Sequence, residues 1–318
     1  MIKIFNYYLF KLFSFLLLRL NINNKISNFV KTQIGIQTII LQESKYKFIN
    51  YLEETECKIF SQNGEDGIIN FLTKSLNIEN PNFVEIGVGD YSEANTRFLF
   101  EMKNSKGIII DVMEDLENKV KKNISLWKGD LKICQEKIET GNVNDVLKKN
   151  CNFEIDIFSL DIDGIDYWIA DKIDPKISKI FILEYNSTFG PNLEITVPNI
   201  ENFKRSDYHY SHLCYGASLK LLINLMKRKG YYFLGSNILK NNAFFINNDY
   251  KKDIYFPNIK IKDLNFYTNS NIRESRTKTG KLNFLSGQNK LNEIKDCEVV
   301  NLKNLNNIEK LKISNLIK

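Results

Sequence analysis

The sequence predicts an α/β protein with a doubly wound, mostly parallel β-sheet, a C-terminal antiparallel hairpin and an N-terminal helical extension. Short apolar runs alternate with helix-length segments between residues 82 and 186, which is typical of a parallel sheet covered by helices on both faces. Two later apolar runs, residues 231–236 and 243–246, lie so close together that they can only pair as antiparallel neighbours. A parallel crossover needs about a dozen or more residues.

The chain is long enough for one large domain with extensions. It has 318 residues, of which 43% are hydrophobic, as is ordinary for a protein with a sizeable core. We expect an N-terminal extension over residues 1–56, a Rossmann-like domain over 57–250 and a C-terminal extension over 251–318. The net charge of +6 comes from lysines spread along the whole chain. No basic-aromatic motif is present, so a nucleic-acid partner is not expected.

The cysteine pattern indicates a reducing compartment. The five cysteines are scattered and have no CxxC spacing, which supports neither a disulfide framework nor a zinc site. A cytoplasmic location is therefore expected.

Residues 1–20 are crowded with apolar and aromatic side chains, interrupted by Lys3, Lys11 and Arg19. The longest run without charge covers residues 12–18, short of the ~20 residues that a membrane-spanning helix needs. No small-residue cleavage site follows, so a secretory signal is not expected. Two interpretations remain: a helix packed on its own domain or on a partner subunit, and a cationic helix lying at the inner membrane surface.

Residues 22–56 are predicted to form a polar helical connector. Residues 60–67 then form a loop that leads into a helix, because apolar periodicity begins at residue 68. Glu65 and Asp66 would lie near the positive N-terminal end of this helix. They either cap the helix or belong to a lid over a ligand pocket.

The stretch 83–90 is the centre of the prediction. It has the pattern of a short buried strand that contains an acid, Glu85, and is followed by Gly87 and Gly89. The glycines let the backbone turn sharply and approach a ligand where a side chain would block it. A helix-forming run over residues 91–100 completes the first strand, turn and helix of a nucleotide-binding α/β domain.

The remaining elements follow in order. Further strands are expected at 107–111, 131–134, 155–161 and 179–186, and helices at 114–123, 143–149, 166–172 and 216–229. An irregular stretch over residues 187–214 holds the only two histidines, His209 and His212. Beyond residue 250 the periodicity is weak. Residues 266–285 are expected to be ordered against the domain, and roughly the last 20 residues to form a helix or a frayed tail.

Four of the five predicted parallel strands end in acids. These are Glu85, Asp111, Asp161 with Asp163, and Glu184. Ligands of doubly wound sheets bind at the carboxyl ends of the strands. The acids therefore predict one binding site at that edge of the sheet.

The order of these elements resembles that of class I S-adenosylmethionine-dependent methyltransferases. Within that class the sequence is similar to the FkbM-like methyltransferases of bacterial polysaccharide and natural-product gene clusters. The similarity extends over residues 57–250 and rests on residues 61–66, 83–90, 95–96, 156–164 and 184–186. Tyr91 stands where the usual glycine motif has a third glycine.

The resemblance implies S-adenosylmethionine as the cofactor and assigns roles to individual residues. Glu85 would face the ammonium of the methionine half, and Asp161 would lie beside the methyl group. Asp111 would accept hydrogen bonds from the ribose hydroxyls, which suits an ionised carboxylate. The full set of expected cofactor contacts is Glu65, Glu85, Gly87, Gly89, Asp111, Asp161 and, near the adenine, Glu136 or its neighbour Gln135.

Methyl transfer to a hydroxyl requires a base that takes the hydroxyl proton. The candidates are Asp161, Asp163 and one of His209 and His212, since the pKa of a histidine lies near neutrality. Alternatively, the histidines are structural loop residues, and Asp163 with Gly164 shapes a turn and caps the next helix.

Hard oxygen ligands also come together at this edge of the sheet. Asp161 or Asp163, with Glu184 and Asn186, would offer the oxygens that Mg²⁺ prefers. Some class I O-methyltransferases use such a site to orient a hydroxyl pair. The predicted metal set is therefore Asp163, Glu184 and Asn186.

The predicted function is O-methylation of a sugar hydroxyl in a surface glycan or its precursor. The hydrophobic N-terminus would fit a lipid-linked acceptor. One alternative is a nicotinamide-dependent oxidoreductase, against which the terminal hairpin argues. Another is a non-catalytic domain that binds ligands or partners in an assembly complex. The strand-end acids argue against this alternative, because a domain that had lost its catalytic site would not need them.

Overall fold

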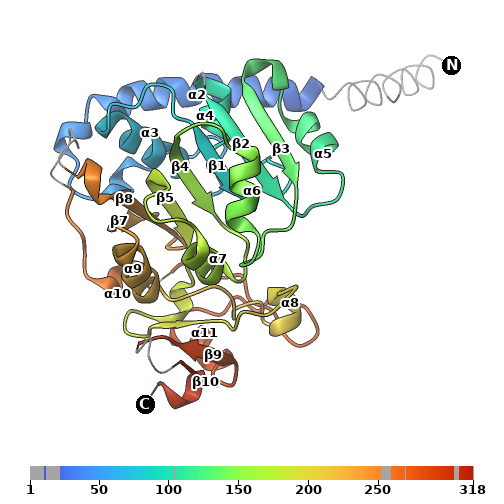
Figure 1. Cartoon of the computed structure of the whole chain (residues 1–318), viewed down its shortest axis with the longest axis vertical. Coiled ribbons are helices and arrows are strands. Elements are labelled where there is room, and N and C mark those ends of the chain that lie inside the picture. The colour runs from blue at the N-terminus through green and yellow to red at the C-terminus, as the bar shows by residue number, and fades with distance from the viewer. Residues whose placement is uncertain are drawn as a thin grey trace.

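The computed structural model contains the predicted sheet. It describes Lys11 and residues 22–103, 105–251, 259–268, 270–303 and 308–317, so the expectation for residues 1–20, Lys11 apart, lies outside the described residues. Seven strands pair in the order β3-β2-β1-β4-β5-β8-β7 (Figure 1). They are β1 Phe83–Ile86, β2 Lys106–Asp111, β3 Asp130–Gln135, β4 Ile155–Leu160, β5 Ser178–Glu184, β7 Tyr231–Ser236 and β8 Asn242–Asn247. Strands β1 to β5 are parallel and β8 is antiparallel to both of its neighbours, which confirms the predicted fold class.

Helices cover the sheet and precede it in the chain. The α-helices are α2 Ile22–Glu43, α3 Glu65–Ser75, α4 Arg97–Met102, α5 Leu116–Asn123, α6 Val143–Asn150, α7 Asp166–Lys172, α8 Arg205–Tyr208, α9 Leu219–Arg228, α10 Leu264–Tyr267 and α11 Gln288–Glu293. The 3-10 helices are η1 Tyr46–Phe48, η2 Leu52–Thr55, η3 Leu126–Lys128, η4 Ser187–Phe189, η5 Asn248–Tyr250 and η6 Ile313–Asn315. Of the helices in the described ranges, none is both long and apolar enough to cross a bilayer.

The sheet separates two hydrophobic layers. Along β1, Val84 and Ile86 point to one face and Phe83 points to the other, as strand alternation requires. The first face packs against α6, α7 and α9, and the second against α3, α4 and α5. Because both faces are covered, β1 and β4 are buried along their whole length and are almost continuously apolar.

The strand order reverses between β1 and β4, and such a reversal opens a crevice at the carboxyl ends of the strands. Gly87 follows β1 at this point with a φ of 87°. A Cβ added to it would lie 1.6 Å from the carbonyl oxygen of Asp161. Glycine is therefore required where the chain leaves β1 beside the end of β4.

The turn after β1 is longer than predicted. The expected helix over residues 91–100 begins only at Arg97, the first residue of α4. Tyr91 occupies the position of the missing third glycine and adopts a left-handed φ of 61°, which a glycine would favour. Its ring is fully buried and its hydroxyl lies 3.1 Å from Thr96 Oγ1, so contacts in the core offset the strain of its backbone.

The described part of the C-terminus forms two strands of a second sheet and the short 3-10 helix η6, in place of one terminal helix or a frayed tail. Strand β9 (Glu298–Asn301) pairs antiparallel with β10 (Glu309–Lys312) and with β6 (Ile195–Thr196). Val299 and Val300 are buried in this sheet. In Figure 1 it lies at the end of the molecule toward which β2 and β3 point, away from α2. The sequence did not reveal it because β9 pairs with a strand far earlier in the chain.

Candidate functional site

A cleft of about 830 Å³ lies at the carboxyl ends of β1, β2 and β4, where the strand order reverses. Its volume falls in the range of small-molecule binding sites. We refer to it as the strand-end cleft. Six of the predicted site residues line it: Gly87, Gly89, Asp111, Glu136, Asp161 and Asp163.

The strand-end cleft is strongly acidic. Among the described residues, its lining includes eight carboxylate side chains and a single basic one, Lys137. The eight acids are Asp90, Glu93, Asp111, Glu136, Glu139, Asp161, Asp163 and Glu201. Such a lining produces a negative potential that attracts a cationic ligand and repels a phosphate-rich one.

Asp111 is held rigidly at the end of β2. Its Oδ2 accepts a hydrogen bond from Gly89 N at 2.7 Å, and its Oδ1 accepts one from Met113 N at 2.8 Å. Each carboxylate oxygen keeps a further lone pair for a ligand. The same side chain therefore fixes the glycine turn and offers a pair of acceptors to the cleft.

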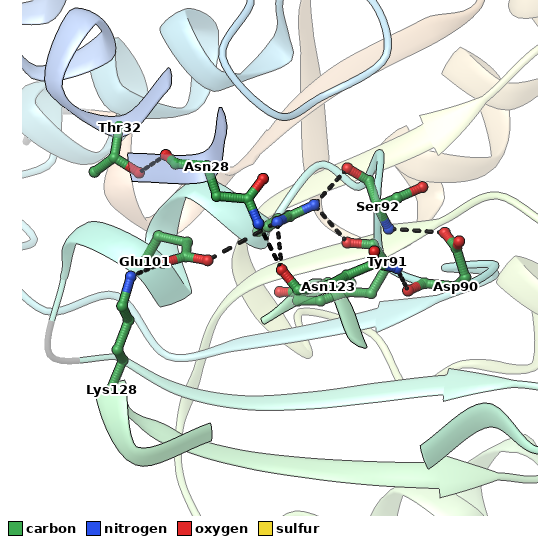
Figure 2. Close-up of polar contacts among 9 residues, drawn as sticks. Asn28, Thr32, Asp90, Tyr91, Ser92, Glu101, Asn123 and Lys128 are labelled. Atoms are coloured by element: carbon green, nitrogen blue, oxygen red, sulfur yellow. Dashed lines mark hydrogen bonds and ion pairs between the residues drawn. The ribbon is translucent and has the colours of Figure 1, made fainter. Parts of the chain in front are cut away.

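A buried arginine, Arg97, supports the glycine turn from behind. Its guanidinium donates to the carbonyl oxygens of Tyr91, Ser92 and Asn123 at 3.3, 2.7 and 2.8 Å. The carbonyl oxygen of Asn123 also accepts a hydrogen bond from Asn28 of α2 (Figure 2). The N-terminal helix is thus tied through this network to the loop that borders the cleft.

Glu85 is hydrogen-bonded to the loop before α4. Its Oε1 accepts a hydrogen bond from Asn95 N and its Oε2 accepts one from Thr96 N, both at 2.9 Å. The side chain is buried and is not among the residues that line the strand-end cleft. Burial raises the pKa of this carboxyl, and the bonds from Thr96 and Asn95 oppose the rise. Glu85 therefore shapes the turn before α4, and its contact with a cofactor ammonium stays a prediction.

The two acids at the start of α3 also have structural roles. Asp66 is fully buried, and its Oδ2 accepts three backbone hydrogen bonds of 2.8 Å. The donors are the N–H groups of Ile59, Phe60 and Ser61. Glu65 Oε1 accepts hydrogen bonds from the amides of Asn237 and Asn242, at 2.8 and 2.9 Å. Glu65 therefore faces the β7–β8 hairpin, and its contact with a cofactor stays a prediction.

Three carboxyl groups meet where β4 and β5 end. Oxygens of Asp161, Asp166 and Glu184 lie within 4.8 Å of one another. Burial raises the pKa of Asp161 and of Glu184 well above the ordinary values, and the neighbouring negative charges add to the rise. Oε2 of Glu184 is buried and has no hydrogen-bond partner among the described residues. A shared proton or a bound cation would satisfy this oxygen.

Two members of the predicted metal set of Asp163, Glu184 and Asn186 are bonded to other groups. Asn186 uses its amide nitrogen and its amide oxygen on backbone groups of neighbouring loops. Asp163 forms an ion pair of 2.7 Å with Arg205. The cluster that does form contains Glu184 together with Asp161 and Asp166.

The two histidines lie outside the strand-end cleft. Nδ1 of His209 is 2.7 Å from Ser211 Oγ, and its ring centroid is 4.3 Å from that of Tyr210. This arrangement fits the structural interpretation of His209. His212 borders a small hollow beside Arg205.

One wall of the strand-end cleft was not predicted, and residues 137–141 and 199–203 line it. Gln62 also lines the cleft, and it belongs to the loop over residues 60–67, for which a lid was one of the two interpretations. The segment 199–203 belongs to the irregular stretch that holds the histidines, and irregularity was its only signal. Loops of this kind have no periodic pattern that places them over a site.

Comparison with known proteins gives similarity of fold only. No family model and no curated protein matches the sequence. Among solved structures, an S-adenosylmethionine-dependent methyltransferase from Clostridium acetobutylicum ATCC 824 shares 10% identity over 56% of this chain and 89% of its own, with a TM-score of 0.37. The N-terminal domain of EvdMO1, solved in the presence of SAH and D-fucose, shares 8% identity over 58% of this chain and 81% of its own, with a TM-score of 0.37. Similarity at this level carries no argument about activity or substrate.

Proposed function

We propose that the chain is an S-adenosylmethionine-dependent O-methyltransferase that acts on a sugar hydroxyl of a surface glycan or its precursor. The observation that carries this proposal is the acidic lining of a cleft at the strand-order reversal. The sulfonium of S-adenosylmethionine is cationic, and the molecule has no phosphate. A nicotinamide dinucleotide would bring a pyrophosphate against the same carboxylates, which would repel it.

The sheet supports the same choice. Antiparallel β8 lies between β5 and β7, whereas a dinucleotide-binding sheet of the usual order continues with a sixth parallel strand. Gly87 and Gly89 would let the methionine half approach the backbone, and Asp111 would accept hydrogen bonds from the ribose hydroxyls. Asp161 would then lie beside the sulfonium methyl group, at the border with the carboxyl cluster.

The bound cofactor would supply a methyl group on a positively charged sulfur. The acceptor oxygen attacks the methyl carbon in line with the C–S bond. As the C–O bond forms, the C–S electron pair passes to sulfur and leaves a neutral thioether, while the acceptor proton passes to a base. Asp161 is the preferred base, because it lines the cleft beside the glycine turn after β1.

The carboxyl cluster also fits Mg²⁺. Asp161 and Glu184 present hard oxygens to one point, and Oε2 of Glu184 lacks a partner in the described part of the chain. A bound Mg²⁺ would supply positive charge that orients the acceptor hydroxyl. Turnover that survives exhaustive chelation would show that the cluster holds a proton and no metal.

Calorimetry tests the cofactor proposal. S-adenosylmethionine, SAH and NAD are titrated into the wild type, into Asp111→Ala and into the control variant Asp130→Ala, whose exposed side chain lies at the start of β3. We expect the wild type and the control to bind both sulfur compounds and not NAD. Asp111→Ala should bind them at least about tenfold more weakly, because it loses charged hydrogen-bond acceptors. Binding of NAD alone would favour the oxidoreductase, and cofactor binding without turnover on any glycan would favour the non-catalytic domain.

Helix α2 and the residues that precede it are proposed to contact an anionic membrane surface. Residues 1–42 contain five basic residues and no acid. Six exposed apolar side chains of α2 fall within about 140° of the helix circumference, at about 100° per residue. They are Ile26, Phe29, Val30, Ile34, Ile40 and Leu41. An apolar face beside basic residues is the pattern of a helix that lies at a membrane surface.

A further inference from the structure

Two hollows lie beside the carboxyl cluster, outside the strand-end cleft. The outer hollow has a volume of about 200 Å³ and lies between the loop after β5 and the start of α11. The inner hollow, of about 30 Å³, is bordered by Arg205, His212, Tyr215 and Glu274 among others. Four residues line both hollows: Ser187, Thr188, Ser270 and Lys290. The two hollows are therefore adjacent, and we call them together the C-terminal groove.

The C-terminal groove approaches the reacting edge of the sheet. Arg205 lines its inner hollow and forms the 2.7 Å ion pair with Asp163, which lines the strand-end cleft. This ion pair therefore stands between the groove and the cleft. Tyr215 lines the same inner hollow. Burial raises the pKa of its phenol, and the nearby charges of Glu184 and Asp163 add to the rise. The C-terminal groove and the strand-end cleft are therefore neighbours across this ion pair.

A buried lysine in the groove lacks a charge partner. Lys290 is only 5% exposed, and its Nζ donates to the carbonyl oxygen of Ile272. Among the described residues, no carboxylate lies within 4.0 Å of this ammonium. An ammonium has three donors, and a buried charge is costly unless it is paired. Burial lowers the pKa of Lys290, and the charge of Arg273 adds to the effect.

The rest of the groove suits an acceptor with many hydroxyl groups. Seven of the eighteen residues that line the two hollows have short hydroxyl or amide side chains, which donate and accept hydrogen bonds with sugar hydroxyls. These side chains are Asn186, Ser187, Thr188, Asn241, Thr268, Ser270 and Gln288. The outer volume is below the ~300 Å³ of sites for drug-sized ligands, so it suits one sugar ring better than an oligosaccharide.

We propose that the C-terminal groove is the acceptor site and that it binds a sugar carrying an acidic group, with the acid against Lys290. The acid is a uronate carboxylate or a sugar phosphate, which share the negative charge and the oxygen acceptors that a buried ammonium lacks. This inference rests on the proposed methyltransferase function, because it names the acceptor of that reaction.

Binding of small sugars to the full chain tests the groove. Glucose, glucuronate and glucose 6-phosphate are titrated with and without SAH, so that the groove is tested even if no cofactor binds. We expect the wild type to bind at least one acidic sugar about tenfold or more tightly than glucose. The acidic sugar that binds more tightly shows whether the groove prefers a carboxylate or a phosphate. A wild type that binds all three sugars equally, or none of them, overturns the proposal whatever the variants do.

Two variants and a control locate the effect. Lys290→Met keeps the length of the side chain and should lose the preference for the acidic sugar, while Lys290→Arg should keep most of it. Lys295→Met removes an exposed lysine from the same region and should change nothing. SAH binding should be equal in all four proteins, because Lys290 is not among the residues of the strand-end cleft. An acid preference that persists in Lys290→Met places the acid elsewhere and contradicts the inference.

Discussion

At the scale of single residues, the buried acids of this protein differ in how many hydrogen bonds they accept. Glu85 and Asp66 each receive several backbone N–H groups, and these bonds fix loops. Glu184 has an oxygen without any described partner, close to Asp161. The first kind of acid stabilises the fold around the cleft, and the second kind remains available for a proton, a cation or a substrate.

The sequence predicted which acids gather at the sheet edge but not all of their directions. Strand alternation explains the direction of Glu85. Val84 and Ile86 point to one face of the sheet, so Glu85 between them points to the other face, toward α4. Asp111 is the last residue of β2 and Asp161 follows β4, and both reach the cleft because they lie at the strand ends. Side chains within a strand are directed by the pleat, and those at its end are free to face a ligand.

Asp66 makes a prediction about pH. Burial raises the pKa of its carboxyl from 3.8 to about 6 in the folded protein, so the folded state binds a proton more readily than the unfolded state. The stabilisation from that proton is complete below about pH 4 and is lost as the pH rises through 6, because stability falls with pH wherever the folded state binds more protons. Between pH 4 and pH 7.5, denaturant titrations should show that the free energy of unfolding of the wild type falls by on the order of 3 kcal/mol relative to that of Asp66→Asn. Parallel curves for the two proteins would contradict this.

At the scale of elements, the strands were the most predictable part. Strands buried on both faces need continuous apolar runs, and such runs mark the predicted strands within about two residues of their observed ends. The helix predicted at residues 91–100 was placed too early. Its first residues are held in the turn by Arg97, Glu85 and the left-handed Tyr91. These are tertiary contacts, which override local helix propensity.

The exposed face of α2 makes a prediction at this scale. The triple variant Phe29→Ser, Ile34→Ser, Leu41→Ser removes apolar side chains that are 64, 59 and 69% exposed, so its free energy of unfolding should stay within about 1 kcal/mol of the wild-type value. Wild type should co-sediment with vesicles of anionic lipid and be released by high salt. The variant should bind at least about tenfold more weakly, because each buried side chain contributes about 1.5–3 kcal/mol. The exposed polar changes Gln33→Ser and Gln37→Ser serve as the control, and equal binding by all the proteins would rule out this face.

At the scale of the whole molecule, the proposed membrane face and the proposed acceptor groove are far apart in the fold. Helix α2 lies at one end of the sheet and the C-terminal sheet at the other (Figure 1), and the groove is lined by residues of the C-terminal extension. A membrane contact through α2 would leave the groove turned toward solution. This arrangement favours a soluble acidic sugar over the lipid-linked acceptor that the hydrophobic N-terminus suggested.

The C-terminal extension could not be recognised in the sequence as part of the domain core. Residues 251–318 have weak periodicity, and their order depends on pairing between β9 and β6, which lie far apart in the chain. The buried side chains of the extension nevertheless belong to the same hydrophobic cluster as α7 and α9. A layer joined to the core in this way should unfold with it, although it lies at the edge of the molecule.

Ile313 tests this cooperativity. Its side chain is fully buried in the cluster that also contains Leu183 of β5 and Leu222 of α9. Ile313→Ala should lower the free energy of unfolding by about 2–4 kcal/mol, because the cavity and the lost burial cannot be repaired by local collapse. The control Ile308→Ala truncates a side chain that is 58% exposed and should change it by less than about 0.5 kcal/mol.

Hydrogen exchange measured on both variants separates cooperative from local unfolding. If the extension and the sheet form one unit, Ile313→Ala accelerates exchange of the β1 and β4 amides as much as that of the β9 amides. Faster exchange confined to β9 and β10, with β1 and β4 unchanged, would mean that the C-terminal sheet opens by itself. The C-terminal groove could then open while the strand-end cleft stays closed, because residues of the C-terminal extension line the groove and not the cleft.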